Sequence, residues 1–156
     1  MLATVLSAGA VLTTEAVVRT RINRAPRGTY PSMLTKHIQL RRAHNHGIVG
    51  SRPEDRPALA TAAQTAATVV AIGAAALAYI PGVSMPLFGR VGAGLLIGGA
   101  LSNTGERYAK KRVTDYIYLP DSKIPLLRKR IWNIADAAIF NGAVLAAAGI
   151  VLGGNL

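Results

Sequence analysis

Residues 58–80 have the sequence ALATAAQTAATVVAIGAAALAYI and contain no charged side chain. An α-helix rises about 1.5 Å per residue, so about 20 residues cross the hydrocarbon core of a bilayer, which is about 30 Å thick. This segment is long enough and apolar enough to meet that requirement. It therefore predicts a transmembrane helix and indicates a membrane protein.

Three further runs of the chain are almost as apolar, because each contains only one charged residue; they are residues 1–16, 81–102 and 134–156. We therefore predict one all-α, polytopic membrane domain over residues 1–156, with transmembrane helices at about 1–18, 58–80, 84–104 and 133–153. The first run could instead be a secretory signal peptide. Its early part lacks the Lys or Arg typical of such a peptide, so we favour a retained helix.

Small residues recur in these helices at a spacing that lets two helix backbones approach closely. Gly94 and Gly98 form one such pair, and Gly149 and Gly153 form another. Residues 81–86, Pro-Gly-Val-Ser-Met-Pro, predict a tight connection between the second and third helices. The four helices are therefore expected to pack as a bundle.

The overall composition is unusual for a soluble domain. Hydrophobic residues make up 51% of the 156 residues and charged residues only 16%, whereas about 25% is typical of soluble domains. Eighteen Lys and Arg against seven Asp and Glu give a formal net charge of +11. These values argue against a disordered chain and an ordinary soluble enzyme. The absence of cysteine excludes disulfides, thiolate metal sites and cysteine nucleophiles.

The positive charges are concentrated in two long loops, residues 19–57 and 105–132, which hold all the Lys and Arg except Arg90. One helix hairpin separates the loops, so both lie on the same side of the membrane. The positive-inside rule alone would place that side in the cytoplasm. Within the first loop, His37-Ile-Gln-Leu40 is typical of a short strand, so we predict a small β-containing surface loop after the first helix.

The scarce acidic residues are the candidates for chemistry. Four of them lie at or near the predicted helix ends, namely Glu15, Glu106, Asp115 and Asp136. An ionisable group at membrane depth costs at least about 2.5 kcal/mol unless it is paired or hydrated, so such residues are functional candidates. Asn133 precedes Asp136 by three positions, which predicts that the amide shares a helix face with the carboxylate and orients it. Asn103 and Glu106 repeat this spacing.

Asp115 and Asp136 are predicted on the same side of the membrane. Two carboxylates in a poorly hydrated site do not both ionise readily, so one can keep a proton while the other activates a water, as in aspartic peptidases. Two simpler interpretations stay open. The helix dipole alone favours Asp136 in a first helical turn. Asp115 could form an ordinary ion pair with Lys110, Lys111 or Arg112.

The three histidines, His37, His44 and His46, all lie in the first basic loop. His44 and His46 could form a weak metal-binding pair, but no third ligand follows at a supporting spacing. We therefore favour solvent-facing loop histidines and predict no metal site.

Three motifs follow one another in the second half of the chain. Residues 98–107 are Gly-Gly-Ala-Leu-Ser-Asn-Thr-Gly-Glu-Arg, residues 113–117 are Val-Thr-Asp-Tyr-Ile, and residues 132–139 are Trp-Asn-Ile-Ala-Asp-Ala-Ala-Ile, followed by Gly142. In order and spacing they resemble the G-G-A-x-G-N-x-x-D-R, V-x-D-F and F-N-x-A-D-x-x-I-x-x-G motifs of lipoprotein signal peptidase, or signal peptidase II. Residues 44–50, His-Asn-His-Gly-Ile-Val-Gly, resemble the family's N-x-G-A-A-F loop less closely.

The resemblance implies that Asp115 and Asp136 are the catalytic aspartates. It also implies substrate-binding or site-shaping roles for a second group of residues: Asn45 as a substrate-side contact, Asn103 and Asn133 as polar partners, Arg107 as their basic neighbour, and Glu106. Glu106 stands where the family has Asp and is one methylene longer. Glu15 and Arg19 represent the family's first-helix D-x-x-x-K pattern. These departures indicate a divergent branch with an altered substrate range and inhibitor fit.

The resemblance further implies a membrane aspartic endopeptidase that removes the signal peptide from diacylglyceryl-modified prolipoproteins. The bond cut is on the amino side of the lipidated Cys, and no metal or organic cofactor is required. The implied location is the bacterial cytoplasmic (inner) membrane, with the active site toward the outer face and both termini in the cytoplasm. This orientation contradicts the positive-inside rule. We favour it because the charge bias weakens for longer loops.

The expected partners are a lipid-modified prolipoprotein and membrane lipids, including anionic lipids that the basic loops would contact. A monomer is expected. The alternative is a catalytically divergent homologue, or a small non-enzymatic helical membrane protein that binds lipoproteins or anionic lipid. Nucleic-acid binding is not favoured, because the basic loops lack interleaved aromatic residues and a recognisable binding module.

Overall fold

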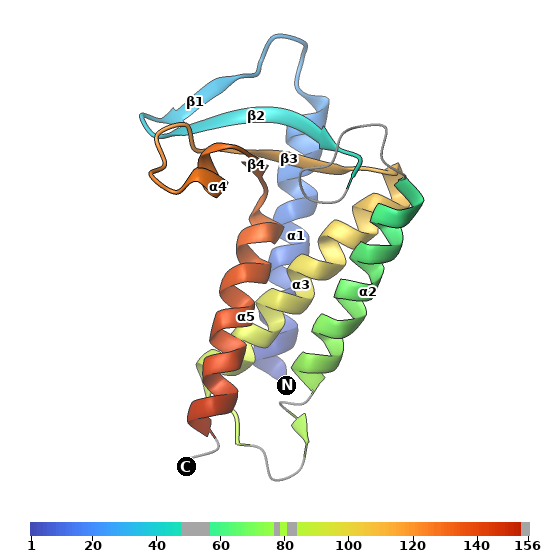
Figure 1. Ribbon diagram of the computed structural model, residues 1–156, viewed down its shortest axis with the longest axis vertical. Helices are drawn as coiled ribbons and strands as arrows, with labels where there is room; N and C mark the ends of the chain where they lie inside the picture. Colours follow the sequence, from blue (N-terminus) through green and yellow to red (C-terminus); the bar gives the residue numbers. More distant parts are fainter. Residues whose placement is uncertain (48–56, 77–78, 81–83, 154–156) are drawn as a thin grey trace.

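The computed structural model describes residues 1–47, 57–76, 79–80 and 84–153 (Figure 1). The long helices are α1 (Leu2–Arg24), α2 (Pro57–Ala76), α3 (Leu87–Lys110) and α5 (Ile134–Gly153). The shorter elements are β1 (Ser32–Thr35), β2 (Ile38–Asn45), β3 (Val113–Tyr118), α4 (Pro125–Arg128) and β4 (Ile131–Trp132). The long helices form a bundle, and the strands lie across one end of it, opposite the start of α1 and the end of α5 (Figure 1).

Two helices extend further than predicted. α1 continues to Arg24 instead of ending near residue 18, and α3 continues to Lys110 instead of ending near residue 104. Arg, Lys and Glu are good helix formers, so hydropathy marks where a helix leaves apolar surroundings and not where its hydrogen bonds end. Gly50 of the predicted family loop and residues 81–83 of the predicted connection lie outside the described residues.

Three of the described helices, α1, α2 and α5, are long and apolar enough to cross a membrane. α3 has 24 residues but is less apolar, since glycines and charged residues such as Arg90 interrupt it. The architecture is therefore mostly helical with three candidate spans. A fourth crossing, by α3, stays a prediction.

Glycine contacts bring the helices close together. α3 packs against α1, α2 and α5. A Cβ added to Gly142 would lie 2.4 Å from a backbone nitrogen of α3, and one added to Gly98 would lie 2.7 Å from a carbonyl oxygen of α1. No side chain fits at such distances, so the absence of one is what allows this packing. All four glycines of the two predicted pairs lie in close contacts of this kind, which confirms the packed bundle.

The strands form one antiparallel sheet in the order β1-β2-β3-β4. The strand predicted around residues 37–40 is confirmed as part of β2, in the β-containing loop expected after the first helix. The sheet is larger than predicted, because the second basic loop supplies β3 and β4. The β-branched and aromatic side chains of Val113, Tyr116 and Ile117 favour a strand there. The fold is therefore a helical bundle with a four-stranded sheet.

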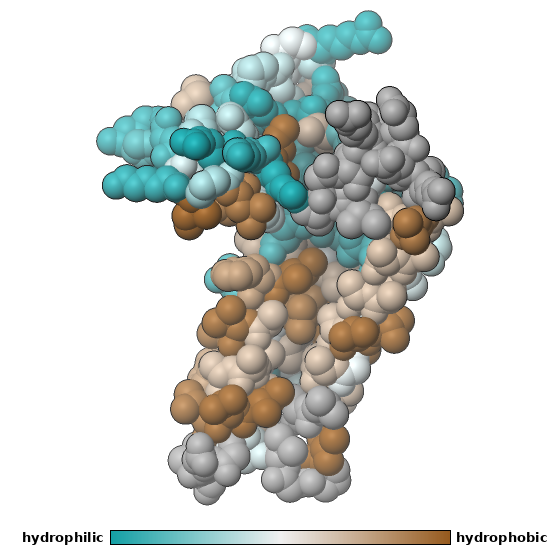
Figure 2. Space-filling view, viewed as in Figure 1, coloured by the Kyte–Doolittle hydropathy of each residue, from teal (hydrophilic) through white to brown (hydrophobic). Residues whose placement is uncertain are grey.

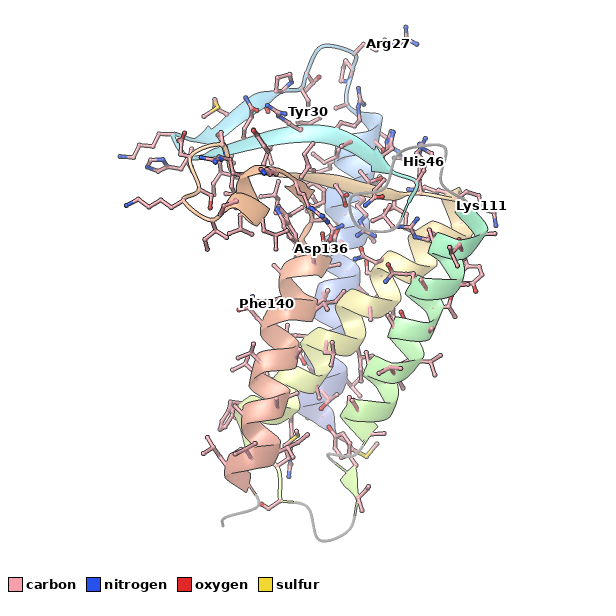
Figure 3. The ribbon with its side chains drawn as sticks, viewed as in Figure 1. Arg27, Tyr30, His46, Lys111, Asp136 and Phe140 are labelled. Atoms are coloured by element: carbon pink, nitrogen blue, oxygen red, sulfur yellow. The ribbon has the colours of Figure 1, made fainter. Side chains whose placement is uncertain are left out.

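The bundle and the sheet differ in the side chains they expose. Figure 2 shows hydrophilic residues over the sheet and hydrophobic residues along the helices. Phe140, which is 70% exposed, points away from α5 (Figure 3), and Val70 and Val151 are 69% and 67% exposed. Large apolar side chains on this scale are typical of lipid-facing helices. The polar sheet would then lie beyond the hydrocarbon core.

Candidate active site

The sequence had suggested that Asp115 lies near a helix end. The structure places it in the middle of β3. The residue is only 7% exposed. Asn133 Nδ2 donates a hydrogen bond of 2.7 Å to its Oδ1, and the Asn45 side chain supplies a further hydrogen bond. Burial, reinforced by the negative charge of Asp136, raises the pKa of Asp115 to about 7. The carboxyl can therefore hold or release a proton near neutral pH.

The ion-pair interpretation of Asp115 is wrong for the described part of the chain. No salt bridge there joins Asp115 to Lys110, Lys111 or Arg112. Lys110 instead pairs with Glu106, with 3.0 Å between Nζ and Oε1. The pairing of β3 with β2 places Asp115 opposite Ala43, inside the sheet and away from the turn that follows α3.

Asp136 lies in the first turn of α5, at the junction of the bundle and the sheet (Figure 3). The N–H of Asn133 donates to Asp136 Oδ2 over 3.1 Å, and the N–H of Asp136 donates to Asn133 Oδ1 over 2.8 Å. This reciprocal pair is a capping box, so a helix cap joins the two residues and not the shared helix face that we predicted. The other carboxylate oxygen, Oδ1, accepts a 2.9 Å hydrogen bond from Asn103 Nδ2.

Each aspartate accepts a hydrogen bond from the side-chain amide of one asparagine. Asn133 neighbours Asp136 in sequence, but its amide donates to Asp115. The repeated spacing had suggested that Asn103 orients Glu106. Asn103 Nδ2 instead donates to Asp136. Both asparagines are buried, at 1% and 4% exposure. Side chains from α3 and the start of α5 thus fix both carboxylates.

Glu106 holds the beginning of β3 in place. Its Oε2 accepts the N–H of Thr114 over 2.9 Å, and its Oε1 accepts the Thr114 hydroxyl over 2.8 Å. Thr114 directly precedes Asp115 in the chain. The Glu106 carboxylate therefore connects α3 to the strand that carries Asp115, which makes it a positioning residue.

A buried ion network connects α1 to the site. Arg19 Nε lies 2.9 Å from Glu15 Oε2, and Arg19 Nη1 lies 3.1 Å from Glu106 Oε2. Arg19 Nη2 also donates to Asn103 Oδ1 over 2.6 Å. Glu15 and Arg19 are 0% and 4% exposed. One guanidinium thus balances two buried carboxylates and orients the amide that donates to Asp136.

Tyr116, which is 2% exposed, was not among the residues predicted for the site. Its hydroxyl donates to Glu15 Oε2 over 3.1 Å and accepts the N–H of Ile134 over 3.3 Å. Glu15 Oε1 accepts the next N–H, that of Ala135. Groups from β3 and α1 therefore cap the first two N–H groups of α5. The sequence offered one indication of this role: Tyr116 stands where the V-x-D-F motif of the family has Phe.

Both aspartates line a single cavity of about 530 Å³. The sheet, α2, and the ends of α3 and α5 enclose it, and α2 contributes mainly small side chains such as Ala60, Ala63 and Ala67. Of the predicted site residues, Asn45, Asn103 and Arg107 also line this cavity. Asn133 and Glu106 instead lie behind the lining and hold it through hydrogen bonds.

Arg107 is 4% exposed and faces this cavity with unused hydrogen-bonding capacity. Its Nη2 donates to the carbonyl oxygen of Gly47 over 3.2 Å. Its Nε and Nη1 are buried and have no hydrogen-bond partner among the described residues. Asn45 Oδ1 accepts the N–H of the same Gly47 over 3.1 Å. Two donors of Arg107 therefore have no acceptor within the described part of the chain.

The histidines have separate surroundings. His44 Nε2 lies 3.0 Å from Asn23 Oδ1, and burial together with the Arg112 charge lowers the pKa of His44. His37 and His46 are exposed, as predicted, whereas His44 is half-buried. Across the residues that the structure describes, no three His, Asp or Glu side chains are grouped to hold a metal ion.

The fold and the site together define a class of protein, namely an apolar helical bundle with a polar cap and two hydrogen-bonded aspartates in a cavity at their junction. The family model described as signal peptidase (SPase) II matches residues 7–152. The chain belongs to the signal peptidase II family, whose members are membrane proteases that act on lipoprotein precursors. No curated protein sequence matches it.

Two solved structures share this fold. Each is described as a bacterial membrane enzyme structure determined by the in meso method, one at 2.3 Å and one at 1.9 Å resolution. The first has a TM-score of 0.73 and 21% sequence identity, over 96% of this chain and 87% of that chain. The second has a TM-score of 0.64 and 21% identity, over 94% and 88%. At this identity the likeness establishes the fold alone.

Proposed function

We propose that this protein is a membrane aspartic endopeptidase that removes signal peptides from diacylglyceryl-modified prolipoproteins, cutting on the amino side of the lipidated Cys. The observation that carries the proposal is the meeting of Asp115 and Asp136 in one cavity. They come from a strand and a helix that are separate in sequence, and each accepts a hydrogen bond from a buried asparagine amide. The family membership supplies the substrate class.

The pair of carboxyls would share one proton at neutral pH. We assign the proton to Asp115, since its pKa of about 7 keeps it substantially protonated there. Asp136 accepts N–H groups from Asn133 and Asn103, an environment that suits a carboxylate. Asp136 would then take a proton from the attacking water, while Asp115 polarises the scissile carbonyl and later protonates the leaving amine.

Arg107 and Asn45 would hold the substrate peptide against the aspartates. The free N–H groups of Arg107 are buried at the cavity wall, where a peptide carbonyl can accept them. Asn45 ends β2 opposite Val113, two residues before Asp115, so a peptide lying along this strand end would pass the reacting groups. Fixed donors in a poorly hydrated cavity stabilise developing negative charge more strongly than water does.

The same proposal includes a fourth membrane crossing and an orientation. The charged residues of α3 lie near its ends, with Arg90 at one end and Glu106, Arg107 and Lys110 at the other. The middle of α3 is therefore free of charge. The active site would lie at the outer face of a bacterial inner membrane, with both ends of the chain inside. Because the chain has no cysteine, single cysteines in the two basic loops give a direct accessibility test. Labelling from the cytoplasm only would overturn this orientation.

The decisive experiment is cleavage of a purified diacylglyceryl-modified prolipoprotein. Wild type should cut it, whereas Asp115→Asn and Asp136→Asn should each lose about 10³-fold or more in kcat, as expected for a coupled catalytic pair. Asp121→Asn is the matched control, because Asp121 is an exposed loop aspartate paired with His37, and it should cut at the wild-type rate.

Two results would contradict the proposal: no cleavage by wild type, or undiminished cleavage by both active-site variants. Either result would favour the alternative, a non-enzymatic homologue that binds lipoproteins or anionic lipid. Two departures from the family motifs favour that alternative, namely Glu106 in place of Asp and the altered first-helix pattern at Glu15 and Arg19. The Glu106 carboxylate accepts hydrogen bonds from Thr114 of β3, so the replacement of Asp by Glu is compatible with an assembled site.

A further inference from the structure

The catalytic cavity contains more positive charge than its two aspartates require. Arg107, Lys129 and Arg130 all line it together with Asp115 and Asp136. If the aspartates share one proton, their combined charge is −1 against three cations among the described residues of the lining. His44 also lines the cavity, but its lowered pKa keeps it neutral at physiological pH. The cavity is therefore cationic around an acidic pair.

Arg130 is one of two side chains in this group with a buried donor that lacks a partner in the described part of the chain. Its Nη1 is buried and has no partner among the described residues. A buried N–H without an acceptor is unfavourable, and more so when the group is charged. Arg107 shows the same feature at Nε and Nη1 on the same cavity. Two guanidinium groups that line this cavity thus have buried donors without a partner among the described residues.

The backbone of Arg130 is fixed relative to the aspartates. Arg130 directly precedes β4, in which Ile131 pairs with Tyr118 and Trp132 pairs with Ile117 of β3. β3 is also the strand that carries Asp115. The guanidinium is therefore carried by the same rigid sheet as one catalytic candidate. Arg130 also lines the same cavity as both aspartates, so a substrate bound there would contact both.

We propose that Arg130, with Lys129 beside it, forms a subsite for an acidic side chain of the substrate, within a few residues of the scissile bond. The proposal rests on the peptidase function and adds a preference to it. A carboxylate of Asp or Glu would accept the buried N–H of Arg130 and reduce the excess positive charge of the cavity. A charge-assisted hydrogen bond of this kind contributes about 1.5–3 kcal/mol. The expected preference for an acidic substrate is therefore about tenfold or more in kcat/KM.

The test uses sets of diacylglyceryl-modified prolipoproteins that differ only by Asp, Asn or Lys, at each position from three before to three after the cut except that of the lipidated Cys. With wild type, the Asp substrate should be cut about tenfold better at one or two positions. Arg130→Gln should bring that ratio close to one. Arg130→Glu should favour Lys over Asp at the same position. Arg128→Gln is the matched control, because Arg128 is exposed and is not part of the cavity lining, and it should keep the full preference.

Two further arms distinguish the subsite from a loss of cleavage itself and from lipid binding. Binding of each substrate set to the Asp136→Asn variant measures the subsite without cleavage, so a failure of the peptidase function still leaves this proposal tested. Repeating the assay in bilayers with and without phosphatidylglycerol tests whether Arg130 binds a lipid headgroup instead. In that case Arg130→Gln would slow all members of a set equally, and only in the anionic bilayer. That result would overturn the subsite, as would an Asp preference that is absent or equally lost in Arg128→Gln.

Discussion

Replacing Asp115 by Asn should abolish cleavage and, above neutral pH, make the folded protein more stable. In an unfolded chain an Asp carboxyl titrates near 3.9. In the fold, burial and the neighbouring Asp136 raise the pKa of Asp115 to about 7. Between these two pH values the unfolded chain has released a proton that the folded protein still holds. The free energy of unfolding therefore falls as the pH rises from about 4 to about 7.

The size of this effect follows from the same pKa difference. A change from 3.8 to about 7 corresponds to about 4 kcal/mol at 1.36 kcal/mol per pH unit, as an upper limit. The Asn variant has no proton to lose, and its Oδ1 can still accept the hydrogen bond that Asn133 donates to Asp115. The variant should therefore match wild type near pH 4 and exceed it at pH 8. For a chain of this length, about 1 kcal/mol changes the Tm by about 2–4 °C.

The assay is thermal unfolding of the detergent-solubilised protein at a series of pH values. We expect the Tm of Asp115→Asn to lie several degrees above that of wild type at pH 8, and the difference to disappear toward pH 4. Asp121→Asn makes the same chemical change at an exposed loop position and should follow the wild-type curve. A variant Tm at or below that of wild type at pH 8 would refute the reasoning, as would a difference that does not depend on pH.

Four other predictions follow from the same contacts. The kcat of wild type should fall as the pH rises above about 7, because Asp115 then loses the proton that we assign to the leaving amine; a rate that stays flat to pH 9 would contradict the assignment. Tyr116→Phe removes the hydroxyl that connects Glu15 to Ile134, so kcat should fall several-fold with little change in KM, and thermal unfolding should show a loss of about 1 kcal/mol of stability. Tyr118→Phe, on the same strand, should change neither kcat nor stability. Glu106→Gln leaves the buried Arg19 with one carboxylate fewer and should cost about 3 kcal/mol by thermal unfolding, and Glu106→Asp, which keeps the charge, should cost less. Gly142→Ala forces a methyl group against the α3 backbone and should cost about 1–3 kcal/mol, whereas Gly105→Ala, which has open space around it, should be neutral or stabilising in the same assay.

The apolar helices were predictable because hydropathy along the chain reflects how each segment meets the lipid. Hydropathy also placed the ends of α1 and α3 too early, because charged side chains continue each helix beyond its apolar part. β3 was missed because it is short and follows a run of basic residues. Whether a strand of six residues forms depends on a partner strand, and β2 lies far from it in sequence.

Candidate residues were identified in sequence, but several of their partners were not. Spacing correctly marked Asn133 and Asp136 as neighbours, since residues three apart are close in any helical turn. It did not indicate that Asn133 donates to Asp115 or that Asn103 donates to Asp136, because those contacts cross between elements. It also gave no indication of Tyr116, whose role depends on the packing of α1 against β3 and α5.

The sequence by itself determined that this is a membrane protein of helices with two basic loops, and its motifs selected two aspartates. Both results depend on local properties, namely hydropathy and the order of residues along one chain. Only the tertiary structure decided how Arg19 balances Glu15 and Glu106, and how Arg107 of α3 and Arg130 beside β4 come to line one cavity with the aspartates. Those interactions join residues that are distant in sequence. Their energies arise from burial and direction, which exist only once the elements have packed.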